Sequence, residues 1–516
     1  MVDSSSETAT TLISDHNARK QSTPTNGNAY PPPRPTKRRT GTGTSESRGS
    51  SGRFRLFRAA TTMAKPEKRV GPAPSAWKSI RAIICASWLN VLLVCIPVSW
   101  ALHFALKESS NKDTLVFVFS FIAIIPLAKL LAFATEELSL RVGQTLGGLL
   151  NATLGNAVEL IVAIIALVKC ELRVVQASLV GSILSNLLLV LGMCFFAGGV
   201  KYSEQGFGVS STQLNSSLLT ISVIAVLLPA AFHFSADAQL DDQTEGRDIL
   251  LVSHGVAIIL LFIYGGYLFF QLYSHTALYQ DKGEHVIQST KYTKREKKGK
   301  TTKVPQEKAE SALVATGSSN NQDGLNGNTP TAHDPEAVSV STDGEEEEET
   351  PQMSVAFTIG LLCVVTVFVA ITAEWLVDSI DGLTDQGGIS KEFVGIILLP
   401  IVGNAAEHVT AVTVSVKDKL TLSLGVAVGS SIQIALFVIP FIVVLGWILG
   451  KPLTLLFDPY ESIALFLSVL TVNYVVQDGK SNWLEGFILM CLYIILAVTF
   501  WFYPGSDPSG LLAKCT

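Results

Sequence analysis

The chain has 516 residues, enough for two or three soluble domains, but only 16% of them are charged and 48% are hydrophobic. Soluble domains carry about 25% charged residues, and the mean hydropathy here is positive at +0.40, so many apolar side chains must face lipid. The net charge of −5 averages unlike segments, and no nucleic-acid partner is expected. The seven cysteines show no CxxC spacing, so the sequence predicts neither a disulfide framework nor a zinc site.

Residues 1–80 are rich in Ser, Thr, Pro, Gly and Arg. Such a composition buries too little apolar surface to fold, so it predicts a disordered basic tail. No short apolar stretch with a basic flank opens the chain. We therefore expect the first membrane helix, and not a cleaved signal peptide, to direct the protein to its membrane.

Beyond residue 80, nearly uncharged apolar runs recur along the chain. A hydrocarbon layer about 30 Å thick requires about 20 such residues per helix, so the pattern predicts an all-α polytopic membrane protein. We count eleven predicted transmembrane helices, at about 82–106, 114–134, 145–168, 174–198, 213–233, 249–273, 353–377, 393–416, 421–449, 459–477 and 484–503.

The distribution of charge predicts how these helices are oriented. Lys and Arg collect on the cytosolic side of membrane proteins, and residues 1–81 contain 15 of them against 5 Asp and Glu. The polar loop at 274–352 begins with a basic cluster, whereas the loop at 237–248 is acidic. We therefore expect the N-terminal tail and the loop at 274–352 in the cytosol. Because eleven is odd, the tail at 504–516 is expected in the lumen.

An internal repeat divides the helices into two related units. Residues 155–190 align without a gap to 403–438, at a constant offset of 248, with 13 identities in 36 positions. The identities include the polar patterns Gly-Asn-Ala-x-Glu and Val-Gly-Ser, which chance similarity between apolar helices would not preserve. After one extra helix at 82–106, the units at 114–273 and 353–503 are thus two five-helix repeats. An odd number of helices per unit inserts the second copy inverted, as in transporters with a binding site at the membrane midplane.

Each repeat places one glutamate, Glu159 or Glu407, within a predicted membrane helix. An ionised carboxylate costs at least a few kcal/mol there, so each is a functional hypothesis. Two carboxylates brought together by inverted symmetry would bind protons or a cation in turn, and oxygen ligands without thiolates favour Ca²⁺. The candidate metal ligands are Glu159, Glu407, Asn156, Asn404, Gly155, Gly403, Ser182, Ser430 and Gln433, and the candidate proton-binding residues are Glu159, Glu407 and His408.

Several residues keep a second interpretation open. His408 has no counterpart in the first repeat and is equally compatible with a satisfied interior histidine. Glu137 and Glu374 stand at matched places near opposite mouths and are gate candidates, although carboxylates at helix ends are often merely solvated. A run of five acidic residues is a candidate for regulatory cation binding or a solvated charge run. It consists of Glu345, Glu346, Glu347, Glu348 and Glu349.

The motifs GNAVELIVAIIAL and GNAAEHVTAV, the eleven-helix layout and the acidic stretch before the seventh helix resemble the cation/proton exchanger (CAX) family of vacuolar Ca²⁺/H⁺ antiporters. The resemblance covers roughly residues 80–505. It implies that Glu159 and Glu407 are the transport carboxylates and that the membrane is that of the vacuole or a similar acidic store. The related Na⁺/Ca²⁺ exchangers carry a further acidic residue in the helix after the second motif. Here that stretch reads Ser-Ser-Ile-Gln at 430–433, which favours protons as the counter-ion.

We therefore expect a secondary antiporter, and not an enzyme, that exchanges cytosolic Ca²⁺ for lumenal H⁺ and needs no cofactor. Mn²⁺/H⁺ exchange, Na⁺/Ca²⁺ exchange and a cation channel remain alternatives. An intramembrane hydrolase lacks support because the sequence contains no GxSxG or HExxH motif. The sequence does not define the oligomeric state.

Overall fold

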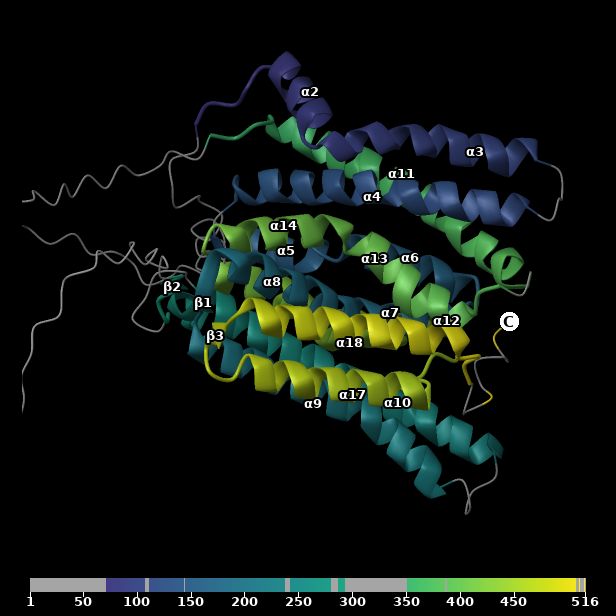
Figure 1. Ribbon diagram of the computed structural model, residues 1–516. Helices are drawn as coiled ribbons and strands as arrows, with labels where there is room; N and C mark the ends of the chain where they lie inside the picture. Colours follow the sequence, from purple (N-terminus) through teal and green to yellow (C-terminus); the bar gives the residue numbers. More distant parts are fainter. Residues whose placement is uncertain are drawn as a thin grey trace, which may run out of the picture. The chain divides into compact units, whose positions relative to one another are not determined.

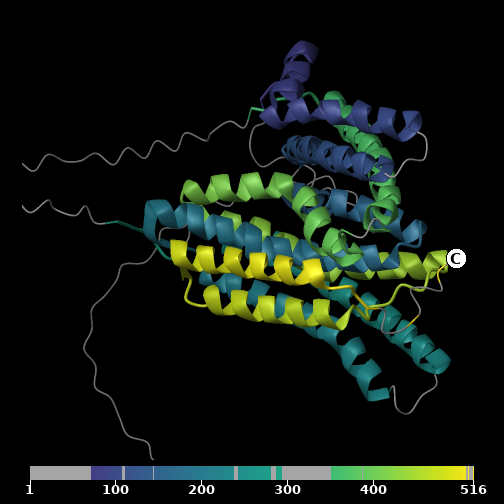
Figure 2. The same ribbon diagram turned by 45° about the vertical axis from the view of Figure 1, so that its right-hand side comes forward.

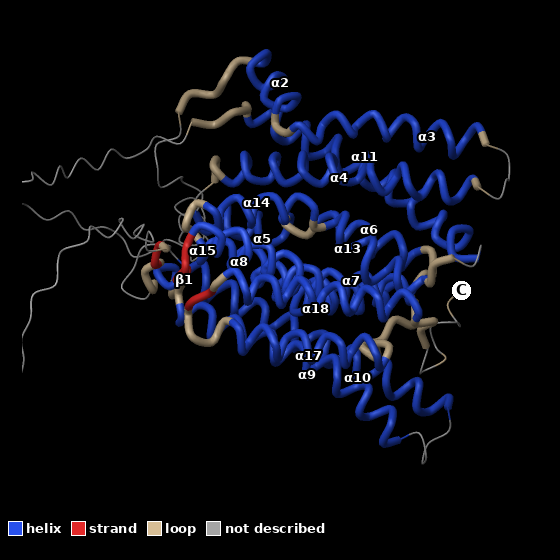
Figure 3. The backbone as a smooth tube through the Cα atoms, viewed as in Figure 1, coloured by secondary structure: helices blue, strands red, loops and turns tan. Residues whose placement is uncertain are grey.

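The structure, a computed structural model, describes residues 71–106, 111–142, 144–236, 242–279, 286–292, 350–385, 388–506, 510 and 515. Helices form most of the described chain, with one small β-sheet (Figures 1 and 3). The basic segment at 1–70 and the acidic run at 345–349 lie outside the described residues. What the sequence predicts for them stays a prediction.

The apolar runs of both halves form helices, joined by short turns. The first half contains α2 (Ala76–Cys85), η1 (Trp88–Val94), α3 (Cys95–Ala105), α4 (Lys112–Ser139), α5 (Gln144–Leu154), α6 (Ala157–Val168), α7 (Leu172–Leu184), the π-helical η2 (Ser185–Val190), α8 (Leu191–Lys201), β1 (Tyr202–Gly206), α9 (Val209–Ala236), α10 (Asp242–Phe269), η3 (Phe270–Ser274), η4 (Thr276–Tyr279) and β2 (Thr290–Lys291). The second half contains α11 (Val355–Asp385), α12 (Lys391–Phe393), the π-helical η5 (Val394–Leu398), α13 (Leu399–Gly403), α14 (Ala405–Val416), α15 (Leu420–Gln433), the π-helical η6 (Ile434–Val438), α16 (Ile439–Leu449), α17 (Pro459–Val475), β3 (Lys480–Ser481) and α18 (Trp483–Phe502).

Eight helices in the described part of the chain are long and apolar enough to cross a membrane, and a ninth crossing results if the bent pair Lys391–Gly403 and Ala405–Val416 is counted as one. The predicted spans at 145–168 and 459–477 are also helical. The first is split into α5 and α6, however, and the second, α17, has only 17 residues. The all-α polytopic membrane class is therefore confirmed, whereas the count of eleven stays a prediction.

Two ends of the helical bundle are defined by different contacts. At one end, which we call the strand end, β1 pairs with both β2 and β3 and so joins the segments that follow α8, η4 and α17 (Figure 1). At the other, the tail end, Asp458 accepts hydrogen bonds from the Tyr503 hydroxyl and the Ser506 backbone N–H. Between these ends, α3, α4 and α11 pack together along one side of the bundle (Figures 1 and 2).

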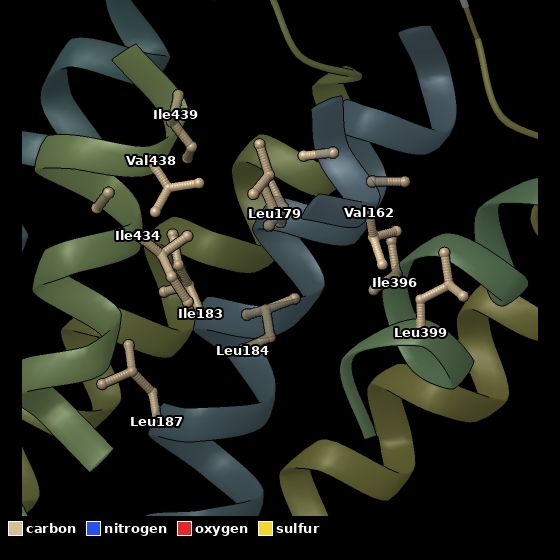
Figure 4. Packing of buried hydrophobic residues seen from close by; sticks show 14 of the residues in the cluster. Val162, Leu179, Ile183, Leu184, Leu187, Ile396, Leu399, Ile434, Val438 and Ile439 are labelled. Atoms are coloured by element: carbon tan, nitrogen blue, oxygen red, sulfur yellow. The ribbon is translucent and has the colours of Figure 1, made fainter. Parts of the chain in front are cut away.

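The hydrophobic core is shared by the two halves of the chain. α7 and η2 are almost wholly buried and occupy its middle. Their side chains lie between apolar residues of α6, η5 and α13 on one side and of η6 and α16 on the other (Figure 4). The labelled members of this core are Val162, Leu179, Ile183, Leu184, Leu187, Ile396, Leu399, Ile434, Val438 and Ile439.

The sequence predicts no disulfide framework, and its cysteine spacing gave no sign of one pair, Cys170 and Cys515. They form a disulfide between the α6–α7 turn and the C-terminal tail, across a sequence separation of 345 residues. The spacing rule detects pairs that are close in sequence, whereas here the fold brings a turn and the chain end to the same end of the bundle. The remaining cysteines, Cys85, Cys95, Cys194, Cys363 and Cys491, are free.

Close packing at Gly181 allows a test of this core. A Cβ added at Gly181 would collide with the backbone of Ile396 in η5, whereas at the equivalent Gly429 it would meet nothing within 4 Å. Gly181→Ala should therefore lower the midpoint of thermal unfolding in detergent, by the equivalent of about 1–3 kcal/mol. Gly429→Ala should leave the midpoint unchanged or raise it by the equivalent of up to about 1 kcal/mol, because alanine favours a helix more than glycine does. Size-exclusion chromatography after a temperature series measures both, and equal midpoints for the two variants would contradict the packing.

Candidate functional site

Both site helices break at the Gly-Asn pair of the repeated motif. α5 ends at Leu154 and α6 begins at Ala157, while α13 meets α14 across Asn404 with a bend of 56°. Glycine is a poor helix former and asparagine favours helix ends, so the same short sequence interrupts both helices. Glu159 and Glu407 consequently lie in the first turns of α6 and α14. There the partial positive charge of a helix N-terminus favours a carboxylate.

The two helices that begin at these breaks run in opposite directions. Cys170, two residues after α6, forms the disulfide at the tail end. Asp418, two residues after α14, accepts a hydrogen bond from Ser289, next to β2 at the strand end. Cys170 and Asp418 are equivalent in the repeat and have nearly identical left-handed φ values of 63° and 62°. The repeats are therefore alike in conformation and inverted in direction.

Matched hydrogen bonds join the two repeats at the breaks. The side-chain amide of Asn156 donates to the carbonyl oxygen of Ser430, and that of Asn404 donates to the carbonyl oxygen of Ser182, both at 3.4 Å. Each serine follows the asparagine of its own repeat by 26 residues. Neither asparagine side chain caps its own helix. Both amides therefore serve the contact between the repeats.

Oxygen atoms from both repeats gather beside Glu407. The Oγ of Ser430 lies 2.6 Å from Oδ1 of Asn156 and 3.2 Å from Oε1 of Glu407. Oε2 of Glu407, Oδ1 of Asn404 and Nε2 of Gln433 are buried without a hydrogen-bond partner. Buried polar atoms without partners point to an absent ligand or water, and carboxylate, amide and hydroxyl oxygens suit Ca²⁺. The carboxylate can bind a proton instead.

Glu159 completes the pair of carboxylates. Its side chain is buried, and a Cβ added at Gly403 would lie 2.7 Å from its Oε1, so the glycine leaves room for the carboxylate in this position. Glu159 also lies within electrostatic range of Glu407. The described residues contain no cluster of three or more His, Cys, Asp or Glu side chains that could hold a metal ion. The candidate site thus combines two carboxylates with neutral side-chain oxygens.

The two carboxylates face cavities of very different size. The cavity beside Glu407 has a volume of about 320 Å³ and is lined by α5, the last turns of α10, η3 and the part of α15 from Gly425 to Gln433. The cavity beside Glu159 has about 20 Å³, room for about one water molecule. Leu376, Leu399 and Val402 are among its lining residues. The site thus has a large cavity toward the strand end and only a constricted one toward the tail end, and we call these its open and closed ends.

The two gate candidates make different contacts. Glu137 is 4% exposed and accepts hydrogen bonds from the backbone N–H groups of Gln352 and Met353, so it anchors the segment before α11. The carboxylate of Glu374 is half exposed and lies 3.4 Å from Nζ of Lys169 at the tail end. Neither touches the oxygen atoms around Glu407 described above.

Some polar residues near the site were not predicted. Asn151 and Gln271 line the larger cavity, and the available signal was their position inside apolar predicted helices. Nε2 of His408, a predicted proton-binding candidate, lies 3.5 Å from Oγ of Ser185. Ser185 occupies the repeat position of Gln433. His408, in the second repeat, therefore contacts the first repeat, just as Ser430 of the second repeat contacts Asn156 of the first.

Three features together define a polytopic membrane transporter: the inverted repeats, the helices broken at their Gly-Asn motifs, and the paired carboxylates beside a cavity. Residues 112–273 and 357–502 match the family of sodium/calcium exchanger proteins, so the chain belongs to this family. The two matched segments coincide with the two repeats. The resemblance to cation/proton exchangers that the motifs indicated is confirmed by the relatives described next.

The chain is similar to named relatives over most of its length. It is 56% identical to the vacuolar calcium ion transporter of Cryptococcus neoformans var. grubii, over 89% of this chain and 80% of the relative. It is 40% identical to the Ca²⁺/H⁺ antiporter of Aphanothece halophytica, over 80% of this chain and 96% of the relative. The solved structure of native YfkE matches with a TM-score of 0.58 and 30% identity, covering 80% of this chain and all of that one. Another crystal structure describes YfkE as a Ca²⁺/H⁺ antiporter.

The unequal surroundings of the two serines predict unequal effects on cation binding. Ser430→Ala removes a hydroxyl that contacts both Asn156 and Glu407, and should weaken equilibrium ⁴⁵Ca²⁺ binding about tenfold. Ser182→Ala changes the wall of the small, closed cavity and should weaken it less than threefold. A scintillation proximity assay on purified protein measures both constants. Equal losses would show that the oxygen cluster is not centred beside Glu407.

Proposed function

We propose that the protein is a Ca²⁺/H⁺ antiporter of a vacuolar-type membrane, moving cytosolic Ca²⁺ into an acidic lumen in exchange for protons. The observation that carries this proposal is the pair Glu159 and Glu407, held on matched broken helices with only one of them facing a large cavity. The names of the relatives support the choice of ions and of compartment.

Ca²⁺ reaches the site through the larger cavity, beside Glu407. Two ionised carboxylates balance the charge of one dication, which is required where water cannot do so. Asn156, Asn404 and Ser430 supply neutral oxygens, because Ca²⁺ takes six to eight oxygen ligands in irregular geometry. The hydroxyl of Ser430 already lies between Asn156 and Glu407, so it needs only to turn its proton away from the ion.

Protons return on the same two carboxylates. Two carboxylates in electrostatic range and low dielectric do not stay ionised without a cation, so they bind protons when Ca²⁺ has left. The site is uncharged when loaded with Ca²⁺ and when doubly protonated, but carries two negative charges when empty. Only the uncharged forms can switch from opening at one end to opening at the other at a low free-energy cost. This difference in cost couples the transport of Ca²⁺ to that of protons.

We assign the strand end to the cytosol and the tail end to the lumen. The basic segment that precedes α2 and the loop that contributes β2 both favour the cytosol by the positive-inside rule. The disulfide between Cys170 and Cys515 at the tail end is compatible with a compartment more oxidising than the cytosol. The cavity of the described conformation therefore faces the side from which Ca²⁺ is taken up.

Coupling is tested by uptake into sealed proteoliposomes. ⁴⁵Ca²⁺ uptake should require an acid-inside pH gradient and fall to background with a protonophore, because protons supply the driving force. A sodium gradient with high sodium inside, at zero pH difference, should drive no Ca²⁺ uptake, since Gln433 stands where a sodium-coupled site would need an acid. Sodium-driven uptake would replace the proposal by Na⁺/Ca²⁺ exchange. Ca²⁺ flux that needs neither a pH gradient nor a sodium gradient would indicate a channel.

The role of the two carboxylates is tested by Glu159→Gln and Glu407→Gln. Each variant keeps the size of the side chain but leaves one negative charge to hold a dication, so exchange driven by the pH gradient should fall about a hundredfold or more. Asn156→Ala and Asn404→Ala remove only a neutral oxygen and should weaken apparent affinity about tenfold.

Reconstituted variants that elute as folded protein are compared by initial ⁴⁵Ca²⁺ flux. The asparagine variants are the matched controls, because they alter the same breaks without removing a titratable group. Exchange near the parent rate in either glutamine variant would remove that residue from the site.

A further inference from the structure

Two lysines join α11 to its neighbours at the tail end. Nζ of Lys169, directly after α6, lies 3.4 Å from Oε1 of Glu374 and 2.5 Å from Oδ1 of Asp378. Lys391, the first residue of α12, pairs with Asp381 of α11, and its Nζ also lies 3.4 Å from Oε2 of Glu171 in the α6–α7 turn. The three acidic residues of α11 are spaced by four and three positions, so they share one face of this helix. We call the ion pairs between α11 and the two lysines the tail-end latch.

The tail-end latch lies on the helical turn that closes the site. Leu376 belongs to the same turn of α11 as Glu374 and Asp378, is 1% exposed and lines the small cavity beside Glu159. Leu179 of α7 lines the same cavity. If this turn of α11 moved away from α6 and α12, the ion pairs would break and the cavity beside Glu159 would open toward the tail end.

The elements on the other side of the latch are fastened to one another by separate contacts. Arg173 of α7 pairs with Glu392 of α12 and also donates to the carbonyl oxygen of Pro504. The disulfide joins the α6–α7 turn to Cys515. The turn, α12 and the C-terminal tail thus form a common base, and the latch connects α11 to this base.

The repeat supplies an internal comparison. Lys417 is equivalent to Lys169 in the second repeat and lies at the strand end, toward which the site is open. It is exposed and pairs with no acidic side chain of the described residues. Within the described residues, the lysine at the closed end is therefore paired with carboxylates, whereas its equivalent at the open end is not.

We propose that the tail-end latch holds the tail end closed while the site faces the strand end, and that it breaks each time the site turns toward the tail end. The inference rests on the proposed transport function. The side chains of Lys169 and Asp378 are 27% and 43% exposed. Ion pairs exposed to this extent are weak, so they can break and re-form in every cycle, which a fully buried pair cannot do at low cost.

The test measures access to the closed cavity through a cysteine at Ser178, which lines it. The full chain carries Ser178→Cys, keeps the disulfide, and has its free cysteines replaced by serine. The rate of modification by a charged methanethiosulfonate reagent is measured in nanodiscs without Ca²⁺. Adding Lys169→Gln and Lys391→Gln should raise this rate at least fivefold, because the cavity opens more often.

Two matched controls separate a latch from general loosening. Lys417→Gln removes the equivalent lysine at the open end and should not raise the rate. The conservative pair Lys169→Arg with Lys391→Arg should keep the rate within twofold of the parent, because both positive charges are retained. An unchanged rate in the double lysine variant, or an equal rise with Lys417→Gln, would overturn the latch.

Failure of the latch and failure of the proposed function give different results. Exchange driven by a pH gradient is measured on the same Ser178→Cys parent in proteoliposomes. Normal exchange with no change in modification rate contradicts the latch alone. Absent exchange with the expected fivefold rise contradicts the proposed function and leaves the latch standing as a conformational contact.

Discussion

An ionised carboxylate at membrane depth is stable only when something neutralises it, and Glu159 and Glu407 place two of them within electrostatic range of each other. The helices that carry them break so that their N-termini and neutral oxygens meet at this point. A break inside a membrane leaves backbone groups to be satisfied, and each repeat satisfies one carbonyl of the other, through Asn156 and Asn404. Neither half could form the site alone.

Residues that are equivalent in sequence have unlike surroundings. Gly181 is packed against η5 while Gly429 faces open space. Glu159 lies beside a cavity of about 20 Å³ and Glu407 beside one of about 320 Å³. Two inverted copies of one unit can adopt two conformations, and exchanging them reverses the open end without a new fold. The different surroundings of the two copies therefore decide which end of the site is open in this conformation.

The repeated Gly-Asn motifs were singled out from the sequence as candidate ligands, but the helix breaks at them were not, because 145–168 and 393–416 were expected to be continuous spans. Glycine and asparagine do favour such breaks within one turn of chain. Glu137 and Glu374 matched equally well by pattern, yet one anchors the backbone at Gln352 and the other faces Lys169. The partners of residues at the helix ends come from distant segments, so no local pattern contains them.

The sequence by itself determined the membrane class, the inverted repeat and the candidate carboxylates, because hydropathy, spacing and repetition are properties of the chain read in order. Only the tertiary structure decided which carboxylate faces a cavity, which lysine is paired and that Cys170 meets Cys515. Both repeats carry the same signals, so sequence treats them as equal. The choice of open end arises from how the two copies pack against each other, and that packing energy depends on contacts between residues hundreds of positions apart.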